Sequence, residues 1–174
     1  MVQPPLYIAS VPVFRRYLGR LALLVGAAEQ HASRTATAEA DLMAARLAPD
    51  MLPFDKQVEI AANFALRACF PLTGRPVPPF GDFPASFAGL RARIVHVTGL
   101  IEALDAAEFA APAEQLQDTA GEARLSLPAE EFLLQYAVPN FFFHLSMAYA
   151  ILRQRGVPVG KGAFDGYHVY PSPR

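Results

Sequence analysis

The sequence predicts an all-α fold in which four long helices form a bundle, with a possible small β-hairpin before the last helix. Apolar residues recur every three or four positions in four separate stretches, which is the pattern of helices that bury one face. The composition is 53% hydrophobic and 18% charged, enough for a thick core or a subunit interface. A chain of 174 residues fits one domain, so we expect residues 1–174 to fold as a single unit.

We expect the first helix to begin at Ser10 as its N-cap, with Pro12 tolerated in the first turn, and to end near His31. Residues 35–49 then form a connection with one helical turn around 41–46. The apolar positions of this helix step by three or four residues: Val11, Phe14, Leu18, Leu21 and Val25.

The second helix is expected just after Pro53, and Pro71 with Gly74 should end it. A crossover loop rich in proline and glycine follows over 73–84. The third helix has the most regular pattern of the chain: Phe87, Leu90, Ile94, Val97, Ile101 and Leu104.

Alternation of apolar and polar residues over 122–127 predicts a small strand or one arm of a hairpin. The fourth helix should open at Pro128, run to Arg155 and end at Gly156. The tail, 157–174, contains too many glycines and prolines for another helix. Its aromatic residues predict that it packs on the bundle or on a neighbouring subunit: Phe164, Tyr167 and Tyr170.

Charge and cysteine content narrow the function classes. Fifteen basic and sixteen acidic residues give a net charge of -1 without a basic cluster, so we expect neither nucleic-acid nor membrane binding. Cys69 is the only cysteine, which excludes an intrachain disulfide and a cysteine-based zinc site. The first ten residues lack the basic start of a secretory signal, so we expect a cytoplasmic protein.

The fourth helix carries the candidate site. Asn140 and His144 stand one helical turn apart, so both project from the same face. We expect this face to be the core stripe of the helix, formed by Leu133, Ala137, Met147 and Ile151. Pro139 lies between them and Tyr136, and a proline inside a helix should kink it there. Three interpretations remain open: hydrogen bonds that fix the helix register, a small-molecule pocket, or a metal site.

Three stretches taken together resemble a known superfamily. These are Arg46-Leu-Ala-Pro-Asp-Met-Leu52, Pro139-Asn-Phe-Phe-Phe-His144 and Ala148-Tyr-Ala-Ile-Leu-Arg153 with the following Gly156-Val157. They resemble an uncharacterised branch of the DinB/YfiT-like superfamily, catalogued as a domain of unknown function. The resemblance spans about residues 7–166. It implies an up-down-down-up four-helix bundle, often dimeric, and several relatives hold a divalent metal on three histidines or act as thiol-dependent transferases.

The resemblance also locates a remnant of that metal site. His144 matches the last histidine ligand, while Asn140 and Gln57 stand where the relatives have their other two histidines. One imidazole of three remains, so we expect no complete site for zinc or nickel unless Asp55 or Glu59 turns inward.

We therefore expect a DinB-like bundle that binds a small molecule between its helices, in a pocket lined by His144, Asn140, Gln57, Tyr136 and Met147. A divergent metal-dependent hydrolase or thiol transferase that uses His144 is the first alternative. A structural or interaction module without a ligand is the second. The run Phe141-Phe142-Phe143 spans too much of the helix circumference to be buried completely, which predicts a homodimer contact or cover by the tail.

Overall fold

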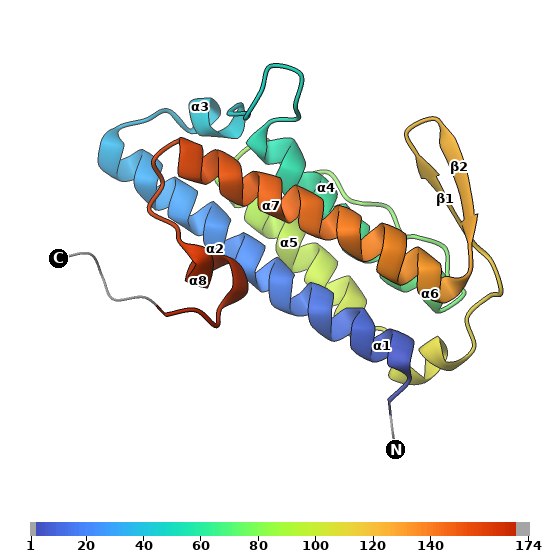
Figure 1. Cartoon of the computed structure of the whole chain (residues 1–174). Helices are drawn as coiled ribbons and strands as arrows, with labels where there is room; N and C mark the ends of the chain where they lie inside the picture. The colour runs from blue at the N-terminus through green and yellow to red at the C-terminus, as the bar shows by residue number, and fades with distance from the viewer. Residues whose placement is uncertain (1–2, 170–174) are drawn as a thin grey trace.

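The computed structural model describes residues 3–169, which are mostly helical with one small antiparallel sheet. Four long helices lie side by side (Figure 1): α2 (Val11–Thr35), α4 (Phe54–Leu72), α5 (Phe87–Glu102) and α7 (Val138–Gln154). Helix α4 contacts both α5 and α7, and α2 contacts α5 on its other side. Within residues 3–169, no helix combines the length and apolar character that crossing a lipid bilayer requires.

The four long helices share one hydrophobic core. The predicted apolar stripes of α2 and α5 are buried, so each of these helices turns toward the core the face that its periodicity indicates. Phe14 of α2 and Phe141 of α7 are fully buried and meet edge to face, with 5.0 Å between their ring centroids. The largest side chains with almost no exposed surface include Phe54, Phe109, Phe132, Leu66 and Leu133.

The beginning of the first helix differs from the prediction. A separate short helix, α1 (Pro5–Ala9), precedes α2, and Ser10 lies between the two without capping α2 by its side chain. Its buried hydroxyl donates to the carbonyl of Leu6 at 2.6 Å, because α1 offers an acceptor one turn back. Helix α2 also continues to Thr35, beyond the predicted end near His31.

The connection and the two middle helices follow the sequence pattern closely. The short helix α3 (Glu39–Met43) lies within the expected connection and begins two residues before the turn predicted at 41–46. Helix α4 starts directly after Pro53, and Pro71 lies in its last turn. After α5, a 3₁₀ helix, η1 (Ala106–Ala110), begins with a capping box between Asp105 and Glu108.

The predicted hairpin is present. Strands β1 (Leu116–Ala120) and β2 (Ala123–Leu127) pair antiparallel, with Leu116 opposite Leu127. Gly121 makes the turn at a φ of +59°, a conformation that glycine adopts without steric cost. The hairpin extends away from the helices (Figure 1).

The last helix starts in three parts rather than as one regular α-helix. Helix α6 (Ala129–Glu131) is followed by the π-helical segment η2 (Phe132–Ala137) and then by α7. In η2 the N–H of Val138 donates to the carbonyl of Leu133, five residues back. This widened turn directly precedes Pro139, so the irregularity that the proline predicted takes the form of a π-helix.

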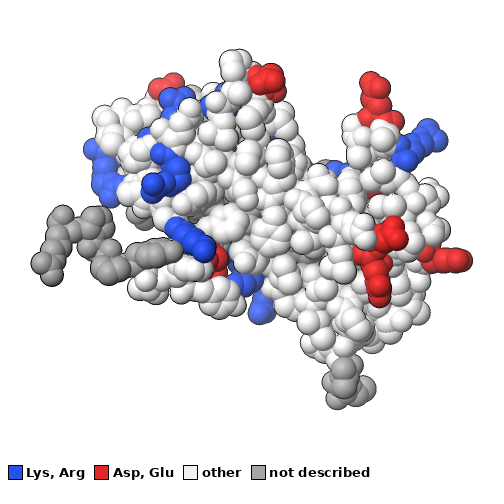
Figure 2. Space-filling model, in the orientation of Figure 1, with Lys and Arg blue, Asp and Glu red and all other residues white. Residues whose placement is uncertain are grey.

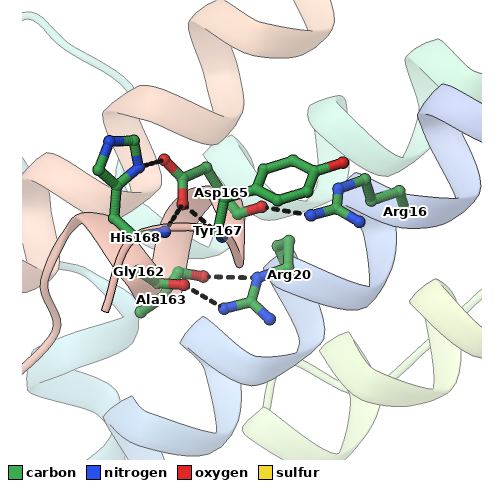
Figure 3. A network of polar contacts seen from close by, with 7 residues as sticks. All are labelled: Arg16, Arg20, Gly162, Ala163, Asp165, Tyr167 and His168. Atoms are coloured by element: carbon green, nitrogen blue, oxygen red, sulfur yellow. Dashed lines mark hydrogen bonds and ion pairs between the residues drawn. The ribbon is translucent and has the colours of Figure 1, made fainter. Parts of the chain in front are cut away.

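The described part of the tail contacts α2. The expectation that its glycines and prolines exclude another helix is wrong, because the short helix α8 (Lys161–Asp165) forms between Gly160 and Gly166. The last carbonyls of α8 accept hydrogen bonds from two arginines of α2 (Figure 3). Arg20 Nε donates to the carbonyl of Ala163 at 2.9 Å, and Arg16 donates to that of Asp165 at 2.7 Å. Arginines at a helix C-terminus satisfy carbonyls that have no partner within the helix. Tyr170 lies outside the described residues.

Two glycines of α5 provide a test of the packing between this helix and the crossover loop. A Cβ at Gly89 would lie 1.9 Å from the carbonyl oxygen of Pro84, whereas a Cβ at Gly99 would meet nothing within 4 Å. We expect Gly89→Ala to lower the free energy of unfolding by about 2 kcal/mol or more, because the loop backbone must move. Gly99→Ala should raise it by about 0.5–1 kcal/mol through helix propensity.

Urea denaturation of both variants beside the wild type measures the difference. Equal stability of the two variants would contradict the close approach of the crossover loop to α5.

Candidate functional site

Helices α4 and α7 bring His144 and Gln57 together. The two residues are 87 positions apart, and His144 Nδ1 lies 2.7 Å from Gln57 Oε1. Gln57 stands in the first turn of α4 and is only 2% exposed. Its other amide atom, Nε2, donates to the carbonyl of Leu52 at 3.1 Å. The amide is therefore held at both ends, and its oxygen faces the imidazole.

This hydrogen bond determines which ring nitrogen of His144 carries the proton. An amide oxygen only accepts, so the neutral ring must donate from Nδ1, which leaves a lone pair on Nε2. Burial lowers the pKa of His144 to about 4, and the positive charge of Arg67 acts in the same direction. At neutral pH the side chain is thus an uncharged imidazole whose Nε2 can accept a hydrogen bond.

The other predicted site residues take different places. Asn140 is half-buried and donates from its side chain to the carbonyl of Tyr136 at 2.8 Å, one turn back in its own helix, rather than to His144. Met147 is half-buried on α7. The hydroxyl of Tyr136 lies 2.8 Å from Arg67, and burial is the main cause that raises the pKa of this phenol.

Arg67 is a member of the cluster that the sequence interpretation missed. It forms an ion pair with Asp118 of β1 at 2.8 Å and stacks on Phe64, 4.4 Å from the ring centroid. The ring of His144 also stacks on Phe64, with 6.0 Å between centroids. One sequence signal was available: Arg67 is the only charged residue between Ile60 and Gly74.

The residues around His144 do not fit a divalent metal. Within the described part of the chain, no three histidine, cysteine or carboxylate side chains gather as a ligand set. Glu59 does not complete one, because it pairs with Lys56 at 2.8 Å. Asp55 accepts from the Lys56 backbone N–H. The guanidinium of Arg67 adds a permanent positive charge beside the imidazole, which opposes binding of a second cation.

A separate cavity of about 640 Å³ opens at the α1 end of the bundle. Mostly apolar residues line it, among them Leu6, Phe109 and Pro128. None of the predicted pocket residues belongs to its lining. The predicted site is therefore a half-buried side-chain cluster between α4 and α7, at a distance in the fold from this cavity.

The shifted pKa of His144 predicts a specific pH dependence of stability. The unfolded chain binds a proton near pH 6.5, while the folded protein resists it down to about pH 4, so stability falls as the pH drops through this window. After allowance for partial solvent exposure of the ring, we expect a loss of about 1–2 kcal/mol between pH 7 and pH 4.

Denaturation at several pH values should show this loss in the wild type and in His96→Gln, since His96 is exposed on α5. His144→Gln should remove it. An unchanged slope in His144→Gln would show that His144 is not the group responsible.

Comparisons with known proteins identify the family. The family described as "Domain of unknown function (DUF1993)" matches residues 6–165. A solved structure, that of a DinB family member protein from Shewanella denitrificans, is 33% identical and superposes with a TM-score of 0.83. The match covers 97% of this chain and 96% of the other. No curated protein matches significantly. The chain therefore belongs to the DUF1993 family of the DinB-like superfamily.

Proposed function

We propose that this chain binds a small molecule without a metal, and that the ligand contacts Nε2 of His144. The proposal rests on one observation: only one of the two ring nitrogens of His144 has a hydrogen-bond partner in the described part of the protein. Gln57 takes Nδ1, and no side chain or backbone group of residues 3–169 donates to Nε2. A lone pair in a half-buried setting gains from a donor that a ligand can supply.

The surrounding groups narrow the chemical class of the ligand. Arg67 provides a positive charge and Tyr136 a phenolic hydroxyl, while Phe64 provides an aromatic face to both Arg67 and His144. A cationic ligand would be repelled by Arg67. The site favours a neutral or anionic molecule that carries a hydroxyl group, which can donate to Nε2 of His144.

We infer the up-down-down-up order of the DinB-like bundle from the connection between α4 and α5, residues 73–86. This connection is long enough to return the chain to the end of the bundle at which α4 begins.

We also infer a cytoplasmic location. The single cysteine, Cys69, is buried and unpaired, which supports a reducing compartment.

The metal-dependent hydrolase or transferase remains the second candidate, because a lone pair on Nε2 is also what a metal ion requires. A single imidazole beside the positive charge of Arg67 does not make a metal site. This candidate therefore needs further metal ligands from outside the described residues. If the protein is instead an interaction module without a ligand, the hydrogen bond between His144 and Gln57 serves only to connect α7 with α4.

Ligand-observed NMR with a fragment library of hydroxylated aromatic compounds and carboxylates tests the proposal. We expect hits with the wild type that disappear in His144→Phe, which keeps a ring but removes Nε2. His96→Phe is the matched control on α5 and should retain the hits. Hits that survive His144→Phe would place the ligand elsewhere, with the cavity at the α1 end as the first place to search.

Elemental analysis of untagged protein, beside His144→Ala, distinguishes the two candidates. The proposal expects metal far below stoichiometric content in both proteins. Near one equivalent of zinc, nickel or iron in the wild type, lost in His144→Ala, would replace the proposal by the metal-dependent candidate.

A further inference from the structure

The cavity of about 640 Å³ at the α1 end of the bundle has no part in the site around His144. Four segments that are distant in the sequence form its walls: the start of α1, the end of η1, the loop that follows η1, and the start of α6. Figure 1 shows α1 and α6 at the same end of the bundle. The volume falls within the range of about 300–1,000 Å³ that is typical of small-molecule sites.

Contacts within the protein hold the walls of this cavity in place. Phe109 is almost completely buried and meets Tyr7 of α1 edge to face, with 5.4 Å between the ring centroids. Glu108 pairs with Arg75 at 2.7 Å, which attaches η1 to the segment after α4. Four of the lining residues are prolines, whose φ is fixed: Pro4, Pro5, Pro112 and Pro128. Such walls lose little conformational entropy when a ligand binds, which favours affinity.

The lining of the cavity accepts hydrogen bonds better than it donates them. Proline has no backbone N–H, so the four prolines offer a ligand no main-chain donor. Among the described residues that line the cavity, the charged ones are Glu114 and Glu130, and no Lys, Arg or His is present. An ionised carboxylate only accepts hydrogen bonds. The cavity therefore disfavours an anion and favours a ligand that donates hydrogen bonds and carries a positive charge.

The two carboxylates have no cationic partner within residues 3–169. Glu114 and Glu130 are exposed, and neither side chain forms an ion pair or a hydrogen bond in this part of the chain. Glu102, which lines a neighbouring hollow, pairs by contrast with Arg15 at 3.6 Å. Figure 2 shows acidic side chains, and no basic ones, around the start of α6. Glu130 also suits the positive N-terminal end of the last helix, whereas Glu114 lies in a loop and has no such role.

We propose that this cavity binds a small organic cation, a protonated amine on an apolar body. The apolar body lies against Leu6, Phe109 and the prolines, where burial of apolar surface stabilises the complex. The ammonium group lies at the exposed rim beside the carboxylates of Glu114 and Glu130, which complement its charge. Arg67 repels a cation from the site around His144, so the two sites take different ligands and the two proposals stand independently.

Isothermal titration calorimetry at neutral pH, with three probes that share one apolar body, tests the charge preference of the cavity. The probes are 4-phenylbutylamine, 4-phenylbutanol and 4-phenylbutanoate, which are cationic, neutral and anionic under these conditions. We expect the amine to bind most tightly and the carboxylate most weakly, because the lining carries negative charge only. Equal affinity for the amine and the alcohol would overturn the proposal, and so would a failure of the amine to bind.

Neutral variants of the two glutamates test where the amine binds. Glu114→Gln and Glu130→Gln should each weaken the binding of 4-phenylbutylamine about 2- to 5-fold, as loss of an exposed ion pair does, and leave that of 4-phenylbutanol unchanged. Glu122→Gln, in the exposed turn of the hairpin, is the matched control and should bind the amine as the wild type does. His144→Phe should do the same, which separates this cavity from the site around His144. Unchanged amine affinity in both glutamate variants, or its loss in His144→Phe, would contradict this location.

Discussion

The amide of Gln57 connects α4 with α7 and at the same time defines the chemistry of His144. Its oxygen accepts from Nδ1 of the imidazole, while its nitrogen is committed to the carbonyl of Leu52. The amide cannot rotate without losing one of these bonds inside a buried setting. The tautomer of His144 and the direction of Nε2 follow from this contact, while burial and the charge of Arg67 keep the imidazole uncharged. A histidine in place of Gln57 would present a ring nitrogen, rather than an amide oxygen, to the imidazole of His144. The chemistry of the site would then differ.

Arg67 gives the neighbourhood of His144 its electrostatic character. It joins helix α4 to the hairpin through Asp118 and to the last helix through Tyr136. Its positive charge acts with burial to keep His144 neutral. The π-helical turn places Tyr136 where its hydroxyl reaches Arg67. Arg67 thus places a cationic side chain beside the imidazole of His144.

The elements with regular apolar periodicity and clear terminators were predictable from the sequence. The stripe of α5 and the start of α4 after Pro53 are as expected, and so is the hairpin before the last helix. The details that the sequence did not predict depend on which of several nearby groups a side chain or backbone group bonds to. Ser10 has the residue type of an N-cap, but the preceding turn of α1 offers its hydroxyl a nearer acceptor. The proline at 139 indicated an irregularity without indicating that it would be a π-helix.

The candidate site was predictable only in part, for a related reason. Spacing along one helix places Asn140 and His144 on one face, and the resemblance placed Gln57 near them. Arg67 remained unnoticed because its partners come from the hairpin and the last helix, which are 51 and 69 residues away. Contacts across such separations depend on how elements pack, and periodicity within a single helix carries no information about them.

The tautomer and protonation state of His144 test the central claim most directly. A two-dimensional NMR spectrum that correlates imidazole nitrogens with ring protons, recorded from pH 8 to pH 4 and assigned with His144→Gln, reports both. We predict an Nδ1–H tautomer that stays neutral at pH 6 and takes a proton only near pH 4. An Nε2–H tautomer, or an imidazolium already formed at pH 6, would contradict the account.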